Sequence, residues 1–313
     1  MSDSLSSSKS AKTEPLIEPV VLIRRMALAI AIATWMVMAI GSATRVMNAG
    51  LACPDWPLCY GTVLPAEQMN LQVFLEWFHR LIACTVGFAT IALFSAGWYF
   101  RQSLPKWLPW AVSGSLSLVI FQGILGGLTV TQLLRFDIVT AHLGTGLLFF
   151  SSLLAIATAL TNQSSFGDGK GEIKTNPSKL AWLGLSAAIL VYLQSILGAL
   201  VASQWALHQC FATQDMCIVL NAHLLGVIPA TIASLAVVIM AWRTKAIAPI
   251  LRRVATIAGF VVIAQVAIGY ATYKLHLQVE LLTIAHQATG SALLGILVGF
   301  AVLAFKTAKY FRT

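Results

Sequence analysis

Eight long apolar segments constrain the fold of this chain more than any other feature. Each runs for roughly 20 residues or more with few charges, the length that an α-helix needs to cross a hydrocarbon core about 30 Å thick. Only 10% of the residues are charged, whereas soluble globular chains average about 25%. The sequence therefore predicts an all-α polytopic membrane protein. The predicted transmembrane helices cover residues 26–44, 77–99, 108–131, 138–161, 180–203, 219–242, 249–273 and 281–305.

The positive charges indicate which side of the membrane each connection faces. Eight spans place both termini on one side, and with that side in the cytoplasm, sixteen of the 20 Lys and Arg residues fall on inner segments. Cytoplasmic loops carry such an excess of basic residues, so the termini are predicted to be cytoplasmic. The net charge of +9 thus reflects topology and not nucleic-acid binding. Four basic residues are left at the outer ends of spans: Arg45, Arg80, Arg135 and Lys274.

Two repeated patterns indicate a duplication. A Gln-x-x-x-Gly motif recurs on the third, fifth and seventh spans, at Gln122–Gly126, Gln194–Gly198 and Gln265–Gly269. Each even-numbered span carries one histidine near its outer end, and the spacing of 63 residues within a pair is the same in both halves: His79 and His142, His223 and His286. The sequence therefore predicts two duplicated four-helix bundles, each with a facing histidine pair.

The predicted division of the chain follows from these repeats. The Ser-rich residues 1–25 are expected to form a disordered cytoplasmic tail and neither a signal peptide nor a transit peptide. The N-terminal half covers 26–161, a cytoplasmic linker 162–179, the C-terminal half 180–306 and a second tail 307–313.

Paired histidines inside a membrane predict a haem site. Ionisable residues are costly there and are usually functional, and two neutral imidazoles on neighbouring helices can ligate one haem iron. Glycines close to the histidines leave room for a flat macrocycle. Zinc or copper is the competing interpretation, although only His79 has a further candidate ligand nearby, Glu76. The four outer basic residues are candidate partners of haem propionates, with ordinary snorkelling as the alternative. His208 and His276 are expected to be surface residues.

The cysteines test the predicted topology. Two pairs fall in loops assigned to the outer, oxidising side, and the disulfides Cys53–Cys59 and Cys210–Cys217 are plausible there. These bridges either staple their loops or, for the first pair, take part in redox chemistry close to His79. Cys84, inside the second span, is expected to be an inert packing residue.

Several of these motifs together resemble haem A synthases. They are Cys53-Pro-Asp-Trp-Pro-Leu-Cys59, Glu76-x-x-His79-Arg80 and the Ala-His motifs at His142, His223 and His286, and the likeness runs from the first span to the last. The resemblance implies oxidation of the C8 methyl of haem O to a formyl group, which gives haem A for haem–copper terminal oxidases. It also implies that His79 and His142 flank the substrate haem beside Glu76, and that His223 and His286 ligate a permanent haem b.

The tail without transit-peptide character favours a bacterial plasma membrane, and the predicted topology places the haem sites and disulfides toward its outer face. The resemblance further implies partners. A haem O synthase and cytochrome oxidase assembly factors are the implied partners, and a homo-oligomer is left open.

Alternatives stay open at this point. Glu76 either accepts a proton or stabilises charge at the reacting methyl, or it bonds Arg80 one turn later and fixes His79. A di-haem electron-transfer protein that oxidises quinol would also use two histidine pairs. A transporter would also be duplicated, but its site would lie at the membrane midplane. The enzyme is favoured because a simple electron carrier has no evident use for the cysteine loop and Glu76.

Overall fold

The structure, a computed structural model, describes residues 18–161, 177–202, 218–244, 247–275 and 277–310. In these ranges eight helices are long and apolar enough to cross a membrane, which confirms the predicted all-α membrane protein. They are α1 (Pro19–Val46), α2 (Leu71–Tyr99), α3 (Leu108–Thr131), α4 (Phe136–Ala159), α5 (Pro177–Ala202), α7 (Ile218–Arg243), α8 (Pro249–Lys274) and α9 (Glu280–Tyr310).

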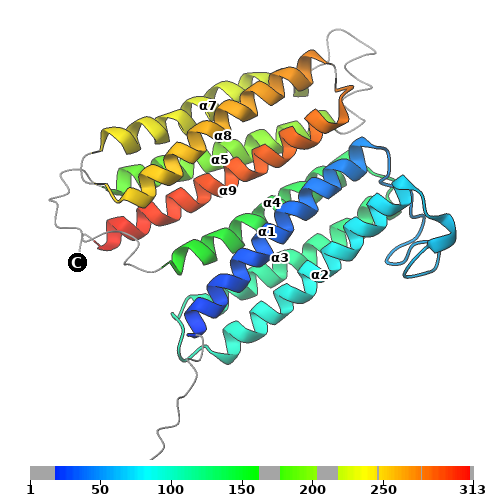
Figure 1. Ribbon diagram of the computed structural model, residues 1–313, viewed down its shortest axis with the longest axis horizontal. Coiled ribbons are helices and arrows are strands. Elements are labelled where there is room, and N and C mark those ends of the chain that lie inside the picture. Colours follow the sequence, from blue (N-terminus) through cyan, green and yellow to red (C-terminus); the bar gives the residue numbers. More distant parts are fainter. Residues whose placement is uncertain (1–17, 162–176, 203–217, 245–246, 276, 311–313) are drawn as a thin grey trace, which may run out of the picture.

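The helices form two bundles of four that lie side by side, as Figure 1 shows. One bundle contains α1 to α4, and the other contains α5, α7, α8 and α9. Helices α1 and α4 of the first bundle pack against α9 of the second, and α4 also contacts α5. The duplication and the predicted division of the chain into two repeated halves stay interpretations of the sequence.

A continuous apolar core joins the two bundles. Phe149 and Leu153 on α4 are almost fully buried in the same cluster as Leu297 and Phe300 on α9. Two hydrogen bonds also connect the two bundles. The Trp35 indole on α1 donates to the carbonyl oxygen of Ala288 on α9 at 2.9 Å, and Lys306 near the end of α9 donates to the last turn of α4. The halves therefore form one packed unit.

Three helices extend beyond the predicted apolar spans. Helix α1 begins at Pro19, so residues 19–25 are helical where a disordered tail was expected, and α9 continues to Tyr310 beyond the expected start of the second tail. Helix α2 begins at Leu71 because the Asn70 side chain caps it, accepting a hydrogen bond from the backbone N–H of Val73 at 3.0 Å. Hydropathy marks only the apolar part of a helix, whereas caps and prolines set its ends.

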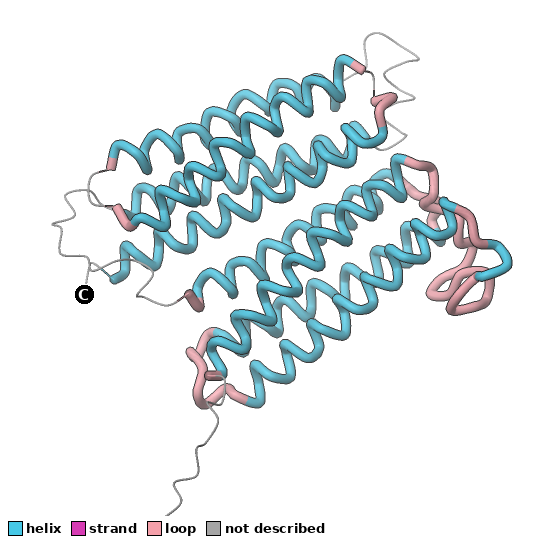
Figure 2. The backbone as a smooth tube through the Cα atoms, viewed as in Figure 1, coloured by secondary structure: helices cyan, strands magenta, loops and turns pink. Residues whose placement is uncertain are grey.

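Residues 47–70 form the longest connection that the structure describes in full, with one 3₁₀ turn, η1 (Ala66–Gln68). Figure 2 shows this loop folded at one end of the first bundle. We call that end of the molecule the loop end. Helices α2, α4, α7 and α9 all begin there, so their early residues gather at one level of the two bundles.

Candidate functional site

Each of the four predicted histidines packs onto a glycine of the preceding helix. The contacts are close: an ideal Cβ built on the glycine would lie 2.6–3.3 Å from the imidazole Cε1, closer at Gly41 and Gly269 than at Gly198 and Gly126. A side chain at these positions would push the ring away. We call these four glycines the seats; they are Gly41 for His79, Gly126 for His142, Gly198 for His223 and Gly269 for His286.

The repeated glutamines lie one turn before three of the seats. Their amides pack against a glycine that follows the histidine on the next helix: Gln122 against Gly146, Gln194 against Gly226 and Gln265 against Gly290. The Gln-x-x-x-Gly motif thus has a structural reason, since the glycine admits an imidazole and the glutamine supports the turn beyond it. Sequence reasoning missed the fourth seat, Gly41, because Val37 stands where the other helices have glutamine.

The second histidine pair has the separation that an axially ligated metal requires. The ring centres of His223 and His286 are 6.4 Å apart and the ring planes are nearly perpendicular, at 89°. A metal–imidazole bond is about 2 Å long, so two imidazoles on opposite sides of one ion bring their ring centres to about 6 Å. His79 and His142 in the first bundle are also close enough to interact electrostatically. The donor set therefore fits a haem iron in either half.

Zinc and copper fit less well. In the described part of the chain, no three His, Cys, Asp or Glu side chains gather as a metal-binding group. Glu76, three residues before His79, already accepts hydrogen bonds from Cys53 and Arg80. Structural zinc sites need four protein ligands and catalytic zinc sites need three. A pair of histidines therefore suits haem better, because the porphyrin itself supplies the other ligands of the iron.

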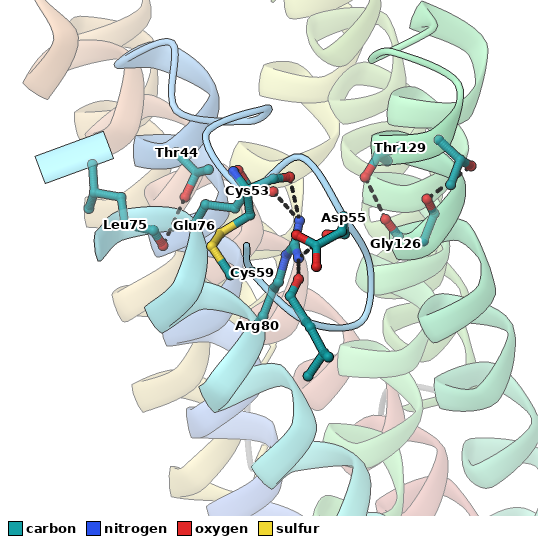
Figure 3. A network of polar contacts seen from close by, with 12 residues as sticks. Thr44, Cys53, Asp55, Cys59, Leu75, Glu76, Arg80, Gly126 and Thr129 are labelled. Atoms are coloured by element: carbon teal, nitrogen blue, oxygen red, sulfur yellow. Dashed lines mark hydrogen bonds and ion pairs between the residues drawn. A yellow bond between two sulfur atoms is a disulfide. The ribbon is translucent and has the colours of Figure 1, made fainter. Parts of the chain in front are cut away.

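Glu76 and Arg80 hold the cysteine loop against α2 (Figure 3), and Arg80 directly follows His79 in the sequence. Glu76 is only 3% exposed; one oxygen accepts from the backbone N–H of Cys53 at 2.8 Å and the other from Arg80 at 2.5 Å. Arg80 also donates to the carbonyl oxygens of Asp55 (2.6 Å), Leu58 (2.5 Å) and Cys53 (3.2 Å). We call these two residues the loop clamp. The structure confirms the ion pair between Glu76 and Arg80 that the sequence suggested. It also shows that both residues bind the backbone of the cysteine loop.

The loop is closed on itself as well as clamped. Cys53 and Cys59 form the predicted disulfide, with both side chains buried. The Asp55 carboxylate accepts hydrogen bonds from the backbone N–H groups of Tyr60 at 2.6 Å and Gly61 at 2.8 Å. The Gly61 hydrogen bond is the main reason that the pKa of Asp55 lies below its usual value of 3.8. Gly61 itself has φ of +71°, a conformation that glycine adopts without strain.

The loop also reaches across to α3. The Trp56 indole lies on Gly127, where an ideal Cβ would be 3.2 Å from the ring atom Cδ2. Gly127 follows directly after Gly126, the seat of His142. The loop is therefore fixed beside both histidines of the first pair, through Arg80 on one side and Trp56 on the other. Sequence reasoning did not identify Trp56 or Gly127 individually.

The outer basic residues differ in how their charges are used. Arg135 pairs with Asp137 at 2.8 Å on an exposed surface, and the Lys274 ammonium lies 5.6 Å from the centre of the Tyr270 ring. Arg45 is half-buried one turn beyond the seat Gly41, and its guanidinium makes no hydrogen bond or ion pair with any residue that the structure describes. It is the basic side chain best placed to meet an anion near the first histidine pair.

Some predicted residues fall elsewhere. Cys84 is exposed on α2, so the expectation of a packed thiol was wrong; the apolar residues around it face outward, where lipid replaces a protein core. Cys210, Cys217, His208 and His276 lie outside the described residues.

Fold and site together define a multi-pass helical membrane protein that presents paired histidines near one end of two four-helix bundles. Residues 24–298 match the model of the cytochrome oxidase assembly protein family, COX15-CtaA. The chain belongs to this family.

Individual relatives agree with this assignment. The chain is 24% identical over 327 residues to the heme A synthase of Rhizorhabdus wittichii, covering 87% of this chain and 90% of that protein. It is 30% identical over 198 residues to the heme A synthase of Shewanella oneidensis, covering 57% of this chain and 56% of that protein. It is also 29% identical over 141 residues to the protoheme IX farnesyltransferase of Haloarcula marismortui, covering 45% of this chain and 29% of that protein.

Proposed function

We propose that this protein is a haem A synthase, which oxidises the C8 methyl of haem O to a formyl group for use in terminal oxidases. The observation that carries the proposal is the pair of matched histidine sites, each ring seated on a glycine. Membership of the cytochrome oxidase assembly family and the printed names of the relatives support the same activity.

In this proposal the two bundles have different tasks. His79 and His142 hold the substrate haem O in the first bundle, and His223 and His286 ligate a resident haem b in the second. The cysteine loop, which lies beside the first pair, supports this division. The haem supplies the redox-active iron, whereas the protein residues bind and orient it.

Arg45 is proposed to bind a propionate of the substrate haem. A half-buried guanidinium with no counter-ion among the described residues favours an anion nearby, and charge-assisted hydrogen bonds to a carboxylate are strong. Arg80 is a weaker candidate, because a propionate would have to displace one of the acceptors it already has. Arg135 and Lys274 are proposed to guide propionates at the membrane surface, where their present contacts are exposed.

The conversion is a four-electron oxidation in which the methyl group loses two hydrogen atoms and gains one oxygen atom: R–CH3 and H2O give R–CHO, four protons and four electrons, and an external acceptor takes up the electrons. Two successive hydroxylations would give a gem-diol, which loses water to form the aldehyde. Glu76 is proposed to keep His79 and the loop in place for these steps. Both of its oxygens already accept hydrogen bonds, so accepting a proton from substrate would first require loss of Cys53 or Arg80 as a donor.

A location and partners follow as part of the proposal. The loop end would face the outside of a bacterial plasma membrane, where the Cys53–Cys59 bridge would persist. The partial likeness to a protein named as a farnesyltransferase supports a link with the enzyme that makes haem O.

The test is extraction and chromatography of haems from protein purified from cells that also make haem O. The proposal expects haem B together with haem O and haem A. His142→Ala should abolish haem A while haem B is retained, and His223→Ala should lower haem B. Two haem B per chain with no haem A would instead establish an electron-transfer protein.

A further inference from the structure

The four seats are alike except at one position. The residue one turn before the seat is glutamine on α3, α5 and α8, and valine on α1. The exception, Val37, belongs to the seat of His79 in the first bundle. Its counterpart in the second bundle is Gln194, before the seat of His223. The two bundles therefore differ in a side chain directly beside an equivalent histidine.

Gln194 is the glutamine that engages its histidine most closely. Its Nε2 lies 2.9 Å from Nδ1 of His223 and donates to the carbonyl oxygen of the same residue at 2.6 Å. By contrast, Gln122 approaches His142 only at 3.5 Å, and Gln265 accepts from the Thr289 hydroxyl. Among the described residues, Nδ1 of the other three histidines has no hydrogen-bond partner. Of the histidines that the structure describes, only His223 has a side chain hydrogen-bonded to Nδ1, because the longer contact of Gln122 is with Nε2 of His142.

At His79 the first bundle lacks the glycine against which Gln194 packs in the second. The Gln194 amide packs against Gly226, three residues after His223, where an added Cβ would overlap it. Three residues after His79 the chain has Ile82, so the missing glutamine and the missing glycine go together. The bundles thus differ at two positions that contact each other: the second has Gln194 and Gly226 where the first has Val37 and Ile82.

We propose that Gln194 is a positioning residue that makes the second bundle the site of permanent haem, whereas Val37 leaves His79 free to release its haem. This inference rests on the proposed function, in which the first haem must leave as product and the second must stay. A residue that hydrogen-bonds the far nitrogen of a ligating histidine fixes the ring and its tautomer, and removing it typically weakens metal binding by about 10–100-fold.

The amide can serve either tautomer of the imidazole. When Nε2 binds iron, Nδ1 carries the proton and needs an acceptor. The Gln194 oxygen is buried without a hydrogen-bond partner among the described residues. For the amide oxygen to accept from Nδ1–H, the Gln194 side chain has to turn about its last bond and also move away from the His223 carbonyl oxygen, which lies 2.6 Å from the present position of Nε2.

The experiment compares Gln194→Val with Gln265→Val in the full-length protein. Both remove the same amide from the same bundle next to a seat, but only Gln194 contacts an imidazole. The chain already carries valine at the equivalent position of α1, so the first variant is compatible with folding. Transfer of haem B to an excess of apomyoglobin gives the release rate, and a redox titration gives the potential of the remaining haem.

The inference expects Gln194→Val to release haem B about 10–100-fold faster, with a changed potential. Gln265→Val, which loses contacts with Thr289 and Gly290 but no hydrogen bond to an imidazole, should change the release rate much less. Gln194→Glu, which keeps an acceptor at the same reach, should restore slow release. Equal release rates and potentials in the two valine variants would overturn it. This outcome is distinct from failure of the proposed function, which would show as absence of haem A from a wild-type protein whose haem B content is normal.

Discussion

Replacing the seat glycines by alanine should damage the histidine sites in proportion to the overlap at each seat. An ideal Cβ would lie 2.6 Å from the His286 ring at Gly269, 2.8 Å from His79 at Gly41, 3.0 Å from His223 at Gly198 and 3.3 Å from His142 at Gly126. Non-bonded carbon atoms keep about 3.5 Å apart, so the ring would retreat by about 0.9 Å at Gly269 but only about 0.2 Å at Gly126. Functional geometry tolerates displacements of about 0.5 Å.

The measurement is the haem B content and release rate of Gly269→Ala, with Gly123→Ala as the matched control. Position 123 is also helical, but an added Cβ there meets nothing within 4 Å. Alanine improves helix propensity by about 1 kcal/mol at either position, so loss of haem would not come from loss of the helix. We expect Gly269→Ala to weaken haem retention by about 10–100-fold and the control to be unaffected.

The other seats extend the same test. Gly198→Ala should have a smaller effect on haem B than Gly269→Ala, and Gly41→Ala should lower haem A formation more than Gly126→Ala. A control as damaging as the seat variants would refute the reasoning, and so would an order of effects unrelated to the four distances.

Three further predictions concern the first bundle. Arg80→Gln should free the cysteine loop, so that the Cys53–Cys59 bridge is reduced faster by dithiothreitol, as followed by thiol labelling; unchanged labelling would show that the disulfide alone holds the loop. Arg45→Gln should lower haem A formation and haem O retention while haem B is unaffected, because only the first site loses its proposed propionate partner; parallel loss of haem B would point to a general folding defect. The hydrogen bonds of Asp55 lower its pKa below 3.8, so they stabilise the loop fully above that value and lose their effect as the pH falls through the lowered pKa. Limited proteolysis of the loop should therefore be unchanged from pH 7 to pH 5 in wild type, whereas Asp55→Asn should be cleaved faster throughout that range; cleavage of wild type that rises steadily between these pH values would contradict this.

The sequence was sufficient to predict the eight spans, because hydrophobic length is a property of each segment by itself. It also singled out the histidines and, in the Gln-x-x-x-Gly repeat, three of the glycines on which they pack, since duplication repeats the same residues at the same spacing; that these glycines contact the histidines is seen only in the structure. Gly41 could not be recognised as part of the repeat, because α1 has Val37 and not glutamine four residues before it. The clamp was only partly foreseen: the spacing of Glu76 and Arg80 predicts an ion pair, but nothing local shows that Arg80 turns back to the carbonyl groups of a loop more than twenty residues away in sequence. Contacts of that kind depend on tertiary structure.

The two bundles share one way of seating histidines and differ in what surrounds each seat. In the first, Arg45, which has no ion-pair partner among the described residues, lies one turn beyond the seat of His79. The clamped cysteine loop contacts α2, which carries His79, and α3, which seats His142. In the second, the polar contact is Gln194, which holds the His223 ring itself. A charged group and a covering loop at the edge of a site suit a molecule that arrives, reacts and leaves, whereas an amide bound to the ligating ring suits one that stays. The difference between an exchangeable and a permanent haem therefore requires no change in the ligands, only a change in the residues that contact them.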